Sequence, residues 1–257
     1  LSITGTGEDG SLTGDLDIIK GTLTIAGTGE STTIIEAGTS AATGIDRVFH
    51  IVSSSLNVTF QDVTIQHGRV TGSNHGGGIF LEGASTLTLT NVKVDSNTVA
   101  YQGGGIRANA SSTLNISNST ISNNVSGSDG SGSGGGIRCN NCTLNMSFST
   151  VSNNISGDGV GTHIAADGAG MRINGGNNHT INQCVISGNT ADSDGGGIRY
   201  DGTTGGTLDI TNSTISGNSA KAFGGGIVNA LADGTVTLNS TTITNNTADS
   251  DNSGGET

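Results

Sequence analysis

Short stretches of alternating hydrophobic and polar residues recur along the chain. In the clearest repeat, Ile106 begins the first stretch, Leu114-Asn115-Ile116 forms the second, and Ile121 lies in the third. Alternation of this kind predicts β-strands that bury one face. The second stretch returns as Leu87/Leu89, Leu144/Met146, Leu208/Ile210 and Val236/Leu238, and the third as Val94, Val151, Ile186, Ile215 and Ile243. The copy at residues 179–181 differs, because it places His179 at an inward position.

A glycine triplet followed by an apolar residue introduces the first stretch of each repeat. The copies lie at residues 76–79, 103–106, 134–137, 195–198 and 224–227, with an altered copy, Gly-Ala-Gly-Met, at 168–171. Along this series the apolar residue advances by 27, 31, 34, 27 and 29 residues. Self-similarity at such a period indicates a solenoid, in which each unit stacks on the next.

An asparagine follows the third stretch by three residues in each of these repeats. The six residues are Asn97, Asn124, Asn154, Asn189, Asn218 and Asn246. We interpret them as an inward-facing ladder, in which each side chain bonds to the asparagines of the coils above and below. Asparagine also tolerates the left-handed backbone that a sharp corner requires, so we expect each of them to stand at a corner.

The first 68 residues lack the glycine triplet but keep the strand pattern. They supply two further coils, with strands at residues 16–18, 23–25 and 34–35 and then at 48–51, 56–58 and 63–65. Parallel strands cannot be joined by hairpins, and parallel crossovers are almost always right-handed. We therefore predict an all-β fold, a right-handed parallel β-helix of about eight coils with three strands per coil. It forms one domain over residues 1–257, with N-terminal coils at 1–68 and glycine repeats at 69–257.

Both ends of the sequence fall inside the repeat pattern. Leu1-Ser2-Ile3-Thr4 reads as part of a strand, and Asn252-Ser253-Gly254-Gly255 reads as the beginning of another glycine motif. Solenoids need capping units at their ends to stay soluble, and no cap is recognisable here. We therefore expect a segment of a longer chain or a unit that associates with its neighbours, end to end or side to side.

Composition narrows the choice of partners. The chain has 257 residues, with 45 glycines and no proline, which suits a tightly wound chain whose strands pair on both sides. A formal net charge of −12 argues against nucleic acid or an anionic membrane as partner. No apolar run reaches the roughly 18–20 residues of a membrane-spanning helix.

Three cysteines give a choice between packing and cross-linking. Cys139 and Cys142 form a C-x-x-C pair, and Cys184 is left over. One such pair with an odd third cysteine is a poor zinc site. The strand alternation places Cys139 in the core, so we expect packing or a local disulfide.

The repeat resembles a known family. The motif G-G-G-I, together with Ile121-Ser122-Asn123-Asn124, is similar to the G-G-A-I and F-x-x-N motifs of polymorphic outer-membrane proteins. More broadly, the chain resembles right-handed β-helix proteins of the pectate-lyase-like class, and residues 1–68 look like the first coils that often precede such repeats. The resemblance implies secretion and display or adhesion at a cell surface. The same fold also hosts polysaccharide lyases and hydrolases.

A column of arginines is the main candidate for binding. The outward residue of the first strand is arginine on four consecutive coils, and polar residues follow two positions later: Arg107, Arg138, Arg172 and Arg199, then Asn109, Asn140, Asn174 and Asp201. Like charges about 5 Å apart repel each other unless opposite charges neutralise them. One source of neutralising charge is the aspartates of the preceding loops: Asp129, Asp158, Asp167, Asp192 and Asp194. The alternative is that the arginines line a groove that binds an acidic glycan, because guanidinium groups suit carboxylates.

Catalysis is the less favoured reading. Lyases of this fold concentrate their calcium ligands and proton acceptor at one place, whereas the arginines repeat. The acidic pair that stands out on strands is Asp201 and Asp209, and glycosidases need two carboxylates at a set separation. Residues 192–194 and 249–251, both Asp-Ser-Asp, offer oxygen ligands for calcium but lack the nonapeptide of calcium-binding β-rolls. We expect no cofactor, with calcium as the open alternative.

The outward face of the second strand is polar and flat. Its Thr, Asn and Asp residues favour an ordinary exposed strand surface over the regular threonine array of an ice-binding protein. Asn115 and Asn145 on this face lie in N-x-S motifs and are candidates for glycosylation. We thus expect a non-catalytic extracellular protein, an adhesin or a component of a fibre or sheath, whose ligand is a glycan or a host-cell surface. The alternative is a polysaccharide-binding or polysaccharide-degrading protein.

Overall fold

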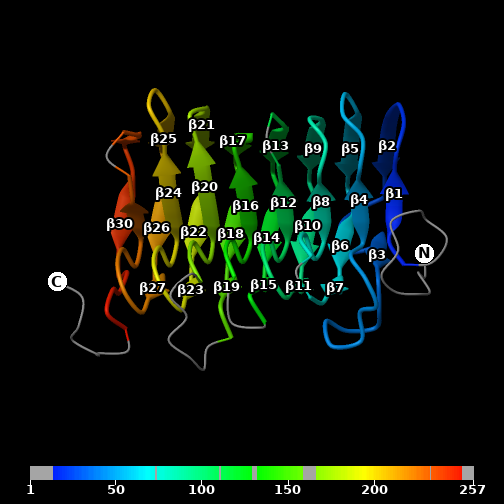
Figure 1. Ribbon diagram of the computed structural model, residues 1–257, viewed down its shortest axis with the longest axis horizontal. Coiled ribbons are helices and arrows are strands. Elements are labelled where there is room, and N and C mark those ends of the chain that lie inside the picture. The colour runs from blue at the N-terminus through cyan, green and yellow to red at the C-terminus, as the bar shows by residue number, and fades with distance from the viewer. Residues whose placement is uncertain are drawn as a thin grey trace.

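The computed structural model is a parallel β-helix, in which the chain winds from one end of a rod to the other (Figure 1). The structure describes residues 14–72, 74–109, 111–128, 132–158, 166–231 and 233–250. Over these residues the chain forms strands and turns. Three sheets each contain eight strands, one from each coil, and a fourth contains six short strands. Within the described ranges no helix is long and apolar enough to cross a membrane.

The strands of each sheet follow in the order of the coils. The first sheet contains β1 (Leu16–Ile18), β4 (Phe49–Ile51), β8 (Ile79–Leu81), β12 (Ile106–Ala108), β16 (Ile137–Asn140), β20 (Met171–Gly175), β24 (Ile198–Gly202) and β28 (Ile227–Asn229). The second contains β2 (Thr22–Ala26), β5 (Asn57–Gln61), β9 (Thr86–Thr90), β13 (Thr113–Ser117), β17 (Thr143–Ser147), β21 (Asn178–Asn182), β25 (Thr207–Thr211) and β29 (Thr235–Asn239).

The third sheet contains β3 (Ile34–Glu36), β6 (Thr64–Gln66), β10 (Lys93–Asp95), β14 (Thr120–Ser122), β18 (Thr150–Ser152), β22 (Val185–Ser187), β26 (Thr214–Ser216) and β30 (Thr242–Thr244). The fourth contains β7 (Arg69–Val70), β11 (Thr98–Val99), β15 (Val125–Ser126), β19 (Ile155–Ser156), β23 (Thr190–Ala191) and β27 (Ser219–Ala220).

The predicted parallel β-helix is confirmed, with one addition. Each coil has the three expected strands, and six coils also have a two-residue strand, which directly follows a ladder asparagine in five of them and follows Gly68 in the first. Two residues are too short to show an alternating pattern, which is why the sequence did not reveal this strand. The coils without glycine triplets continue the same sheets, since Phe49 of β4 pairs with Ile79 of β8.

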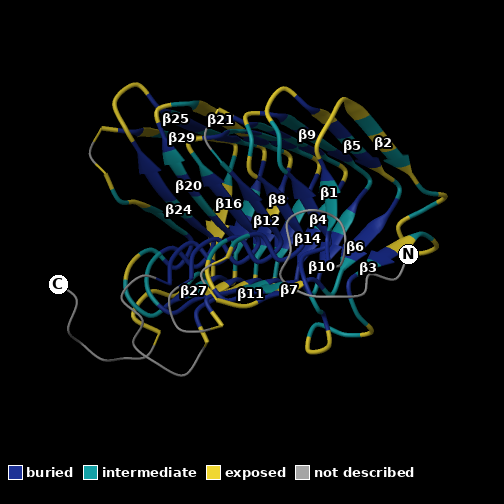
Figure 2. Cartoon of the chain, turned by 45° about the vertical axis from the view of Figure 1, so that its right-hand side comes forward, coloured by how far each residue is buried: buried dark blue, intermediate teal, exposed yellow. Residues whose placement is uncertain are grey.

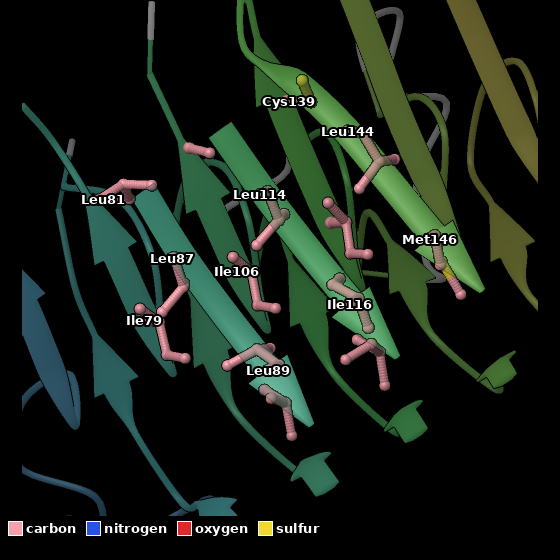
Figure 3. Packing of buried hydrophobic residues seen from close by; sticks show 14 of the residues in the cluster. Ile79, Leu81, Leu87, Leu89, Ile106, Leu114, Ile116, Cys139, Leu144 and Met146 are labelled. Atoms are coloured by element: carbon pink, nitrogen blue, oxygen red, sulfur yellow. The ribbon is translucent and has the colours of Figure 1, made fainter. Parts of the chain in front are cut away.

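The core is a stack of inward side chains in register. Leu114 and Ile116 of β13 lie between Leu87 and Leu89 of β9 and the equivalent residues of β17 (Figure 3). These side chains are at most 2% exposed. Burying one such side chain contributes about 1.5–3 kcal/mol, and each coil covers the open face of the next. A chain that is only 31% hydrophobic can therefore fill a continuous core.

At each position of the triplet, a different physical cause excludes a side chain and so requires glycine. Gly103 has a φ of +74°, and a Cβ there would lie 2.7 Å from the Cβ of Arg107. A Cβ on Gly104 would collide with the carbonyl oxygen of Gly135 in the next coil. A Cβ on Gly105 would lie 3.0 Å from the Cγ of Asn124. The triplet therefore makes room for the chain above it and for the asparagine that ends its own coil.

The predicted asparagine ladder is confirmed. Each side-chain Nδ2 donates to the Oδ1 of the next asparagine, from Asn97 to Asn246, at 2.8–3.0 Å. The expectation that these residues adopt the left-handed backbone is wrong, because that conformation belongs to the residue before each of them. Those residues are Ser96, Asn123, Asn153, Gly188, Gly217 and Asn245.

A second polar ladder stands at the corner between the second and third sheets, and the sequence analysis missed it. The Ser119 hydroxyl accepts from the backbone N–H of Val92 at 3.1 Å and donates to the carbonyl of Ser117 at 2.8 Å. Cys184 occupies the equivalent place, and its backbone N–H donates to the Ser213 hydroxyl at 3.0 Å. The recurrent Asn-Ser-Thr-Ile of residues 118–121 and 212–215 was the available signal.

The expected local disulfide is present. Cys139 and Cys142 are joined across the turn between β16 and β17, with their Cα atoms 5.3 Å apart. Cys184 is a buried free thiol.

Candidate functional site

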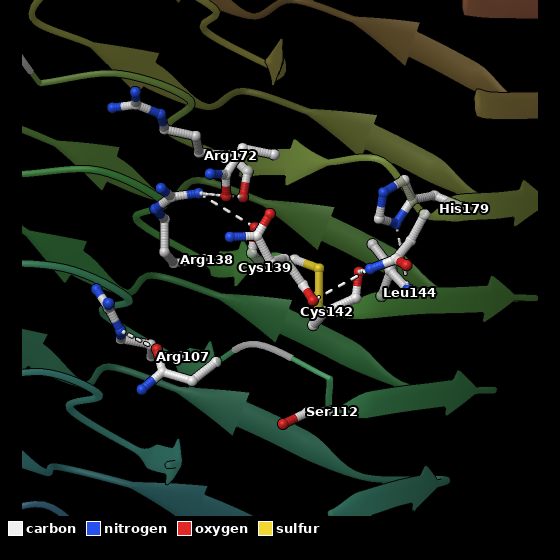
Figure 4. Close-up of a disulfide and its surroundings, with 12 residues drawn as sticks. Arg107, Ser112, Arg138, Cys139, Cys142, Leu144, Arg172 and His179 are labelled. Carbon is white, nitrogen blue, oxygen red and sulfur yellow. Dashed lines mark hydrogen bonds between the residues drawn. A yellow bond between two sulfur atoms is a disulfide. The ribbon is translucent and has the colours of Figure 1, made fainter. Parts of the chain in front are cut away.

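The four arginines form one column on the outward face of the first sheet. Arg107, Arg138, Arg172 and Arg199 are direct neighbours in the register of β12, β16, β20 and β24. Figure 4 shows the first three on successive strands, beside the Cys139–Cys142 disulfide. Their proposed role in binding stays a prediction.

The column does not form an open groove, which was one of the two alternatives that the sequence left. Arg107 and Arg138 are only 7% and 6% exposed, and β8, β12 and β16 are coloured as buried in Figure 2. Five positions before each arginine of the column, the chain passes through the loop that precedes the glycine triplet, and in three coils the residue there contacts the arginine. Gln102, Ser133 and Asp167 hold this place in successive coils, joined by parallel bridges.

The C-terminal half of the column is neutralised by carboxylates. Asp167 pairs with Arg172 at 2.9 Å, and Asp194 pairs with Arg199 at 2.5 Å. Asp201 joins both arginines, at 2.8 Å from the Nε of Arg172 and 2.9 Å from the Nε of Arg199. Burial alone lowers the pKa of Arg199, but the surrounding Asp167 and Asp201 carboxylates raise this pKa above its ordinary value. The predicted acid cover is therefore present in this half.

The N-terminal half has neutral partners. Arg107 donates to the Asn109 oxygen at 3.0 Å and to the Gln102 side chain, and its Nη1 lies 3.2 Å from the Nδ1 of His75. Arg138 donates to the Asn174 oxygen at 2.8 Å. Among the described residues, no carboxylate lies within ion-pair distance of either arginine.

Burial weakens the charged form of both arginines, and neighbouring guanidinium groups weaken that of Arg138 further. Burial lowers the pKa of Arg107 to about 10, and burial together with Arg172 and Arg107 lowers the pKa of Arg138 to about 9. Two charges kept at the spacing of neighbouring strands repel by about 3 kcal/mol at an effective dielectric constant of about 20. An anion bound beside Arg107 and Arg138 would reduce the repulsion between their charges.

Two polar atoms of the Arg138 coil have no partner. The Nε of Arg138 and the hydroxyl of Ser133 are both buried and make no hydrogen bond within the described residues. The Ser133 side chain is shorter than that of aspartate and carries no charge, so it does not form with Arg138 the ion pair that Asp167 forms with Arg172. The remaining candidate of the column, Asn140, lies beside Asn174 in the register of β16 and β20.

The two candidate glycosylation sites lie together on the second sheet. Asn115 and Asn145 face outward on β13 and β17, and the Asn145 amide donates to the Asn115 oxygen at 3.0 Å. With Thr180, they line a shallow hollow of about 330 Å³.

The Asp-Ser-Asp turn at residues 192–194, one of the two proposed for calcium, is engaged with cations of the protein. Asp192 pairs with Lys221 at 2.7 Å, while Asp194 pairs with Arg199. Asp251 lies outside the described residues, as do Asp129 and the loop histidine His163.

A different group offers metal ligands near the N-terminal end. Ligand atoms of Asp15, Asp17 and His50 lie within 4.8 Å of one another. Burial raises the pKa of Asp15 to about 7, and the Arg47 guanidinium lies 2.9 Å from its carboxylate.

The carboxylates considered for catalysis belong to different sheets. Asp201 is held by Arg172 and Arg199 on the first sheet, whereas Asp209 lies on β25 in the second.

One repeat of the chain matches a family of known proteins. Residues 183–199 match the repeat of the Chlamydia polymorphic membrane proteins. This segment contains the ladder residue Asn189, the glycine triplet at 195–197 and the column residue Arg199. The predicted resemblance is therefore confirmed for this repeat, and the fold is the parallel β-helix that it implied. No curated protein matches the chain, and no solved structure does.

Proposed function

We propose that this chain is a β-helical part of an extracellular protein displayed at a cell surface, where it serves adhesion or forms part of a fibre or sheath. The observation that carries the proposal is the match of residues 183–199 to a membrane-protein repeat, at a place where the ladder and the triplet both have their expected geometry. The Cys139–Cys142 disulfide supports an oxidising, extracytoplasmic setting.

A non-catalytic role fits the site better than hydrolysis or elimination. Asp201 is held between two arginines, so it is poorly placed to act as an acid or base. The arginine column also repeats over four coils, whereas a catalytic centre needs one distinct place. Release of unsaturated or reducing sugars from acidic polysaccharides would contradict this part of the proposal.

Surface display is tested on intact cells of the source organism. Antibodies raised against the chain should label these cells without permeabilisation, and external protease should remove the label. A cytosolic protein serves as control and should resist the protease. Adhesion is tested with beads coated with the chain, which should bind target cells more than beads coated with a β-helix of unrelated surface. Labelling that requires permeabilisation would overturn the localisation.

Self-association is a further part of the proposal. Leu238 of β29 and Ile243 of β30 are 47% and 46% exposed, although Ile210 and Ile215 at the equivalent places one coil earlier are buried. Strand edges with exposed apolar residues are templates for pairing with another chain. Sedimentation velocity over a range of concentrations should show species larger than the monomer, and Leu238→Lys should reduce them. A monomer at every concentration would contradict stacking.

A second candidate function is binding of an acidic glycan at the arginine column. Arg107 and Arg138 favour it, because both are buried cations without a carboxylate partner in the described part of the chain. Immobilised polyuronates should retain the chain at low salt, whereas neutral polysaccharides should not. Equal retention by both would contradict it.

A further inference from the structure

The coil that contains Arg138 departs from the pattern of its neighbours at one position. Five residues before each arginine of the column stands a side chain that reaches the guanidinium: Gln102 before Arg107, Asp167 before Arg172, and Asp194 before Arg199. In the Arg138 coil this position is Ser133, whose hydroxyl is buried and makes no hydrogen bond within the described residues.

The guanidinium of Arg138 has donors that no described residue uses. Its Nη1 donates to the Asn174 side chain and to the carbonyl of Cys139, whereas its Nε is buried and has no hydrogen-bond partner among the described residues. Its Nη2 also makes no hydrogen bond with the described residues, and it is not one of the fully buried unpartnered atoms. In the next coil, the Nε and Nη1 of Arg172 are both taken up by carboxylates.

We infer that Ser133 and Arg138 bind the carboxylate group of a ligand, which takes the place that the Asp167 side chain takes beside Arg172. The Ser133 hydroxyl and the Nε–H and Nη2–H groups of Arg138 donate to its oxygens. This inference rests on the second proposed function, glycan binding, and narrows it from a column of four arginines to one coil.

The charges of the column support a single carboxylate as the ligand. Within the described residues, the four arginines pair with three carboxylates, those of Asp167, Asp194 and Asp201. One further carboxylate balances the column, and the protein itself uses carboxylates at the two equivalent positions that follow. Arg107 and Arg172, on either side of Arg138, add attraction for an anion. Such a group comes from a uronic acid residue of a glycan or from a small free carboxylate.

Binding is measured as the rise in the midpoint of thermal unfolding, followed by circular dichroism, because a ligand that binds only the folded state stabilises it. The full chain is titrated with glucuronate, oligoglucuronate and acetate, with glucose as the neutral probe. We expect saturable stabilisation by glucuronate and none by glucose.

Two variants test the position directly. Arg138→Gln should raise the dissociation constant for glucuronate at least about tenfold, since it removes the charged donor. Ser133→Asp supplies the carboxylate from within, so it should raise the unfolding midpoint without ligand and abolish the response to glucuronate. Matched controls with the same charge changes at exposed positions, Lys20→Gln and Ser128→Asp, should respond like the unmodified chain.

Each other outcome has a distinct meaning. No response of the unmodified chain to any carboxylate, or an unchanged response of Ser133→Asp, overturns the site. Retention on polyuronate that both variants leave intact also overturns it, but keeps glycan binding elsewhere on the column. A third outcome is equal stabilisation by acetate and glucuronate with no retention on polyuronate. It supports the site and assigns its ligand to small carboxylates. The proposed glycan-binding function is then wrong, although the carboxylate site stands.

Discussion

The side chains of Asn124 and Asn154 join two successive coils through one oxygen. The Oδ1 of Asn154 accepts from the side-chain Nδ2 of Asn124 and from the backbone N–H of the same residue, both at 3.0 Å. The Nδ2 of Asn154 in turn donates to the Ile121 carbonyl at 3.0 Å. All these groups are buried, so the ladder satisfies backbone atoms that no strand pairing reaches.

Replacing one ladder residue should therefore be costly. Asn154→Ala removes the partner of the buried Asn124 backbone N–H and the side-chain donor to the Ile121 carbonyl, and it leaves the Asn124 side-chain amide with the Val94 carbonyl alone. We expect a loss of about 3–5 kcal/mol in the free energy of unfolding, measured with urea. Asn115→Ala removes an asparagine from the outward face, and it should cost about 1 kcal/mol or less. Similar costs for the two variants would show that burial of the ladder is unimportant.

Glycine 103 offers a test of the triplet. Gly103→Ala and Gly217→Ala both place alanine at a positive φ, which costs about 1 kcal/mol or more. Only at Gly103 would the new methyl group meet Arg107 atoms at 2.7 Å, because Gly217 has no close neighbour. We expect Gly103→Ala to lower the free energy of unfolding by at least about 2 kcal/mol more than Gly217→Ala. Equal losses in urea titrations would mean that crowding at the triplet does not matter.

The strands, the repeat and the ladder could be predicted because each depends on a residue type that recurs in a fixed place. Alternating residues such as Leu114 and Ile116 reveal a buried face, and a regular asparagine reveals a corner. Which arginines lack a carboxylate partner could not be predicted in this way, although Asp167 and Asp194 were among the loop aspartates expected to pair with the column. The difference depends on a loop position, five residues before each arginine, where Gln102, Ser133 and Asp167 differ chemically.

His179 should make stability depend on pH. It is fully buried on β21 against Tyr200, and its Nδ1 accepts from the Leu144 backbone, which places the proton on Nε2. Burial lowers the pKa of His179 to about 4, whereas an unfolded histidine has a pKa of about 6.5. Between these values only the unfolded chain binds the proton, so stability should fall as pH drops from about 7 to 4, by up to about 3 kcal/mol.

A substitution separates His179 from other groups that titrate in the same range, such as His75. His179→Leu copies Leu208, the partner of His179 in the next coil. Urea titrations at pH 7 and pH 4.5 should show a smaller loss for His179→Leu than for the unmodified chain. An identical loss would show that this imidazole does not titrate abnormally.

Asp201 connects the two arginines in the C-terminal half of the column, the half that carboxylates neutralise. It pairs with the Nε of both Arg172 and Arg199 while its side chain is 10% exposed, so Asp201→Asn leaves two partly buried cations with less negative charge around them. Breaking such a pair costs about 2–4 kcal/mol after allowance for partial exposure, and the loss should be visible in urea titrations.

Combining Asp201→Asn with Arg199→Gln removes one of the two cations that pair with Asp201. The double variant should therefore be more stable than the sum of the single losses predicts, by about 1 kcal/mol or more. Strict additivity would mean that Asp167 and Asp194 already neutralise Arg199 and that Asp201 serves Arg172 alone.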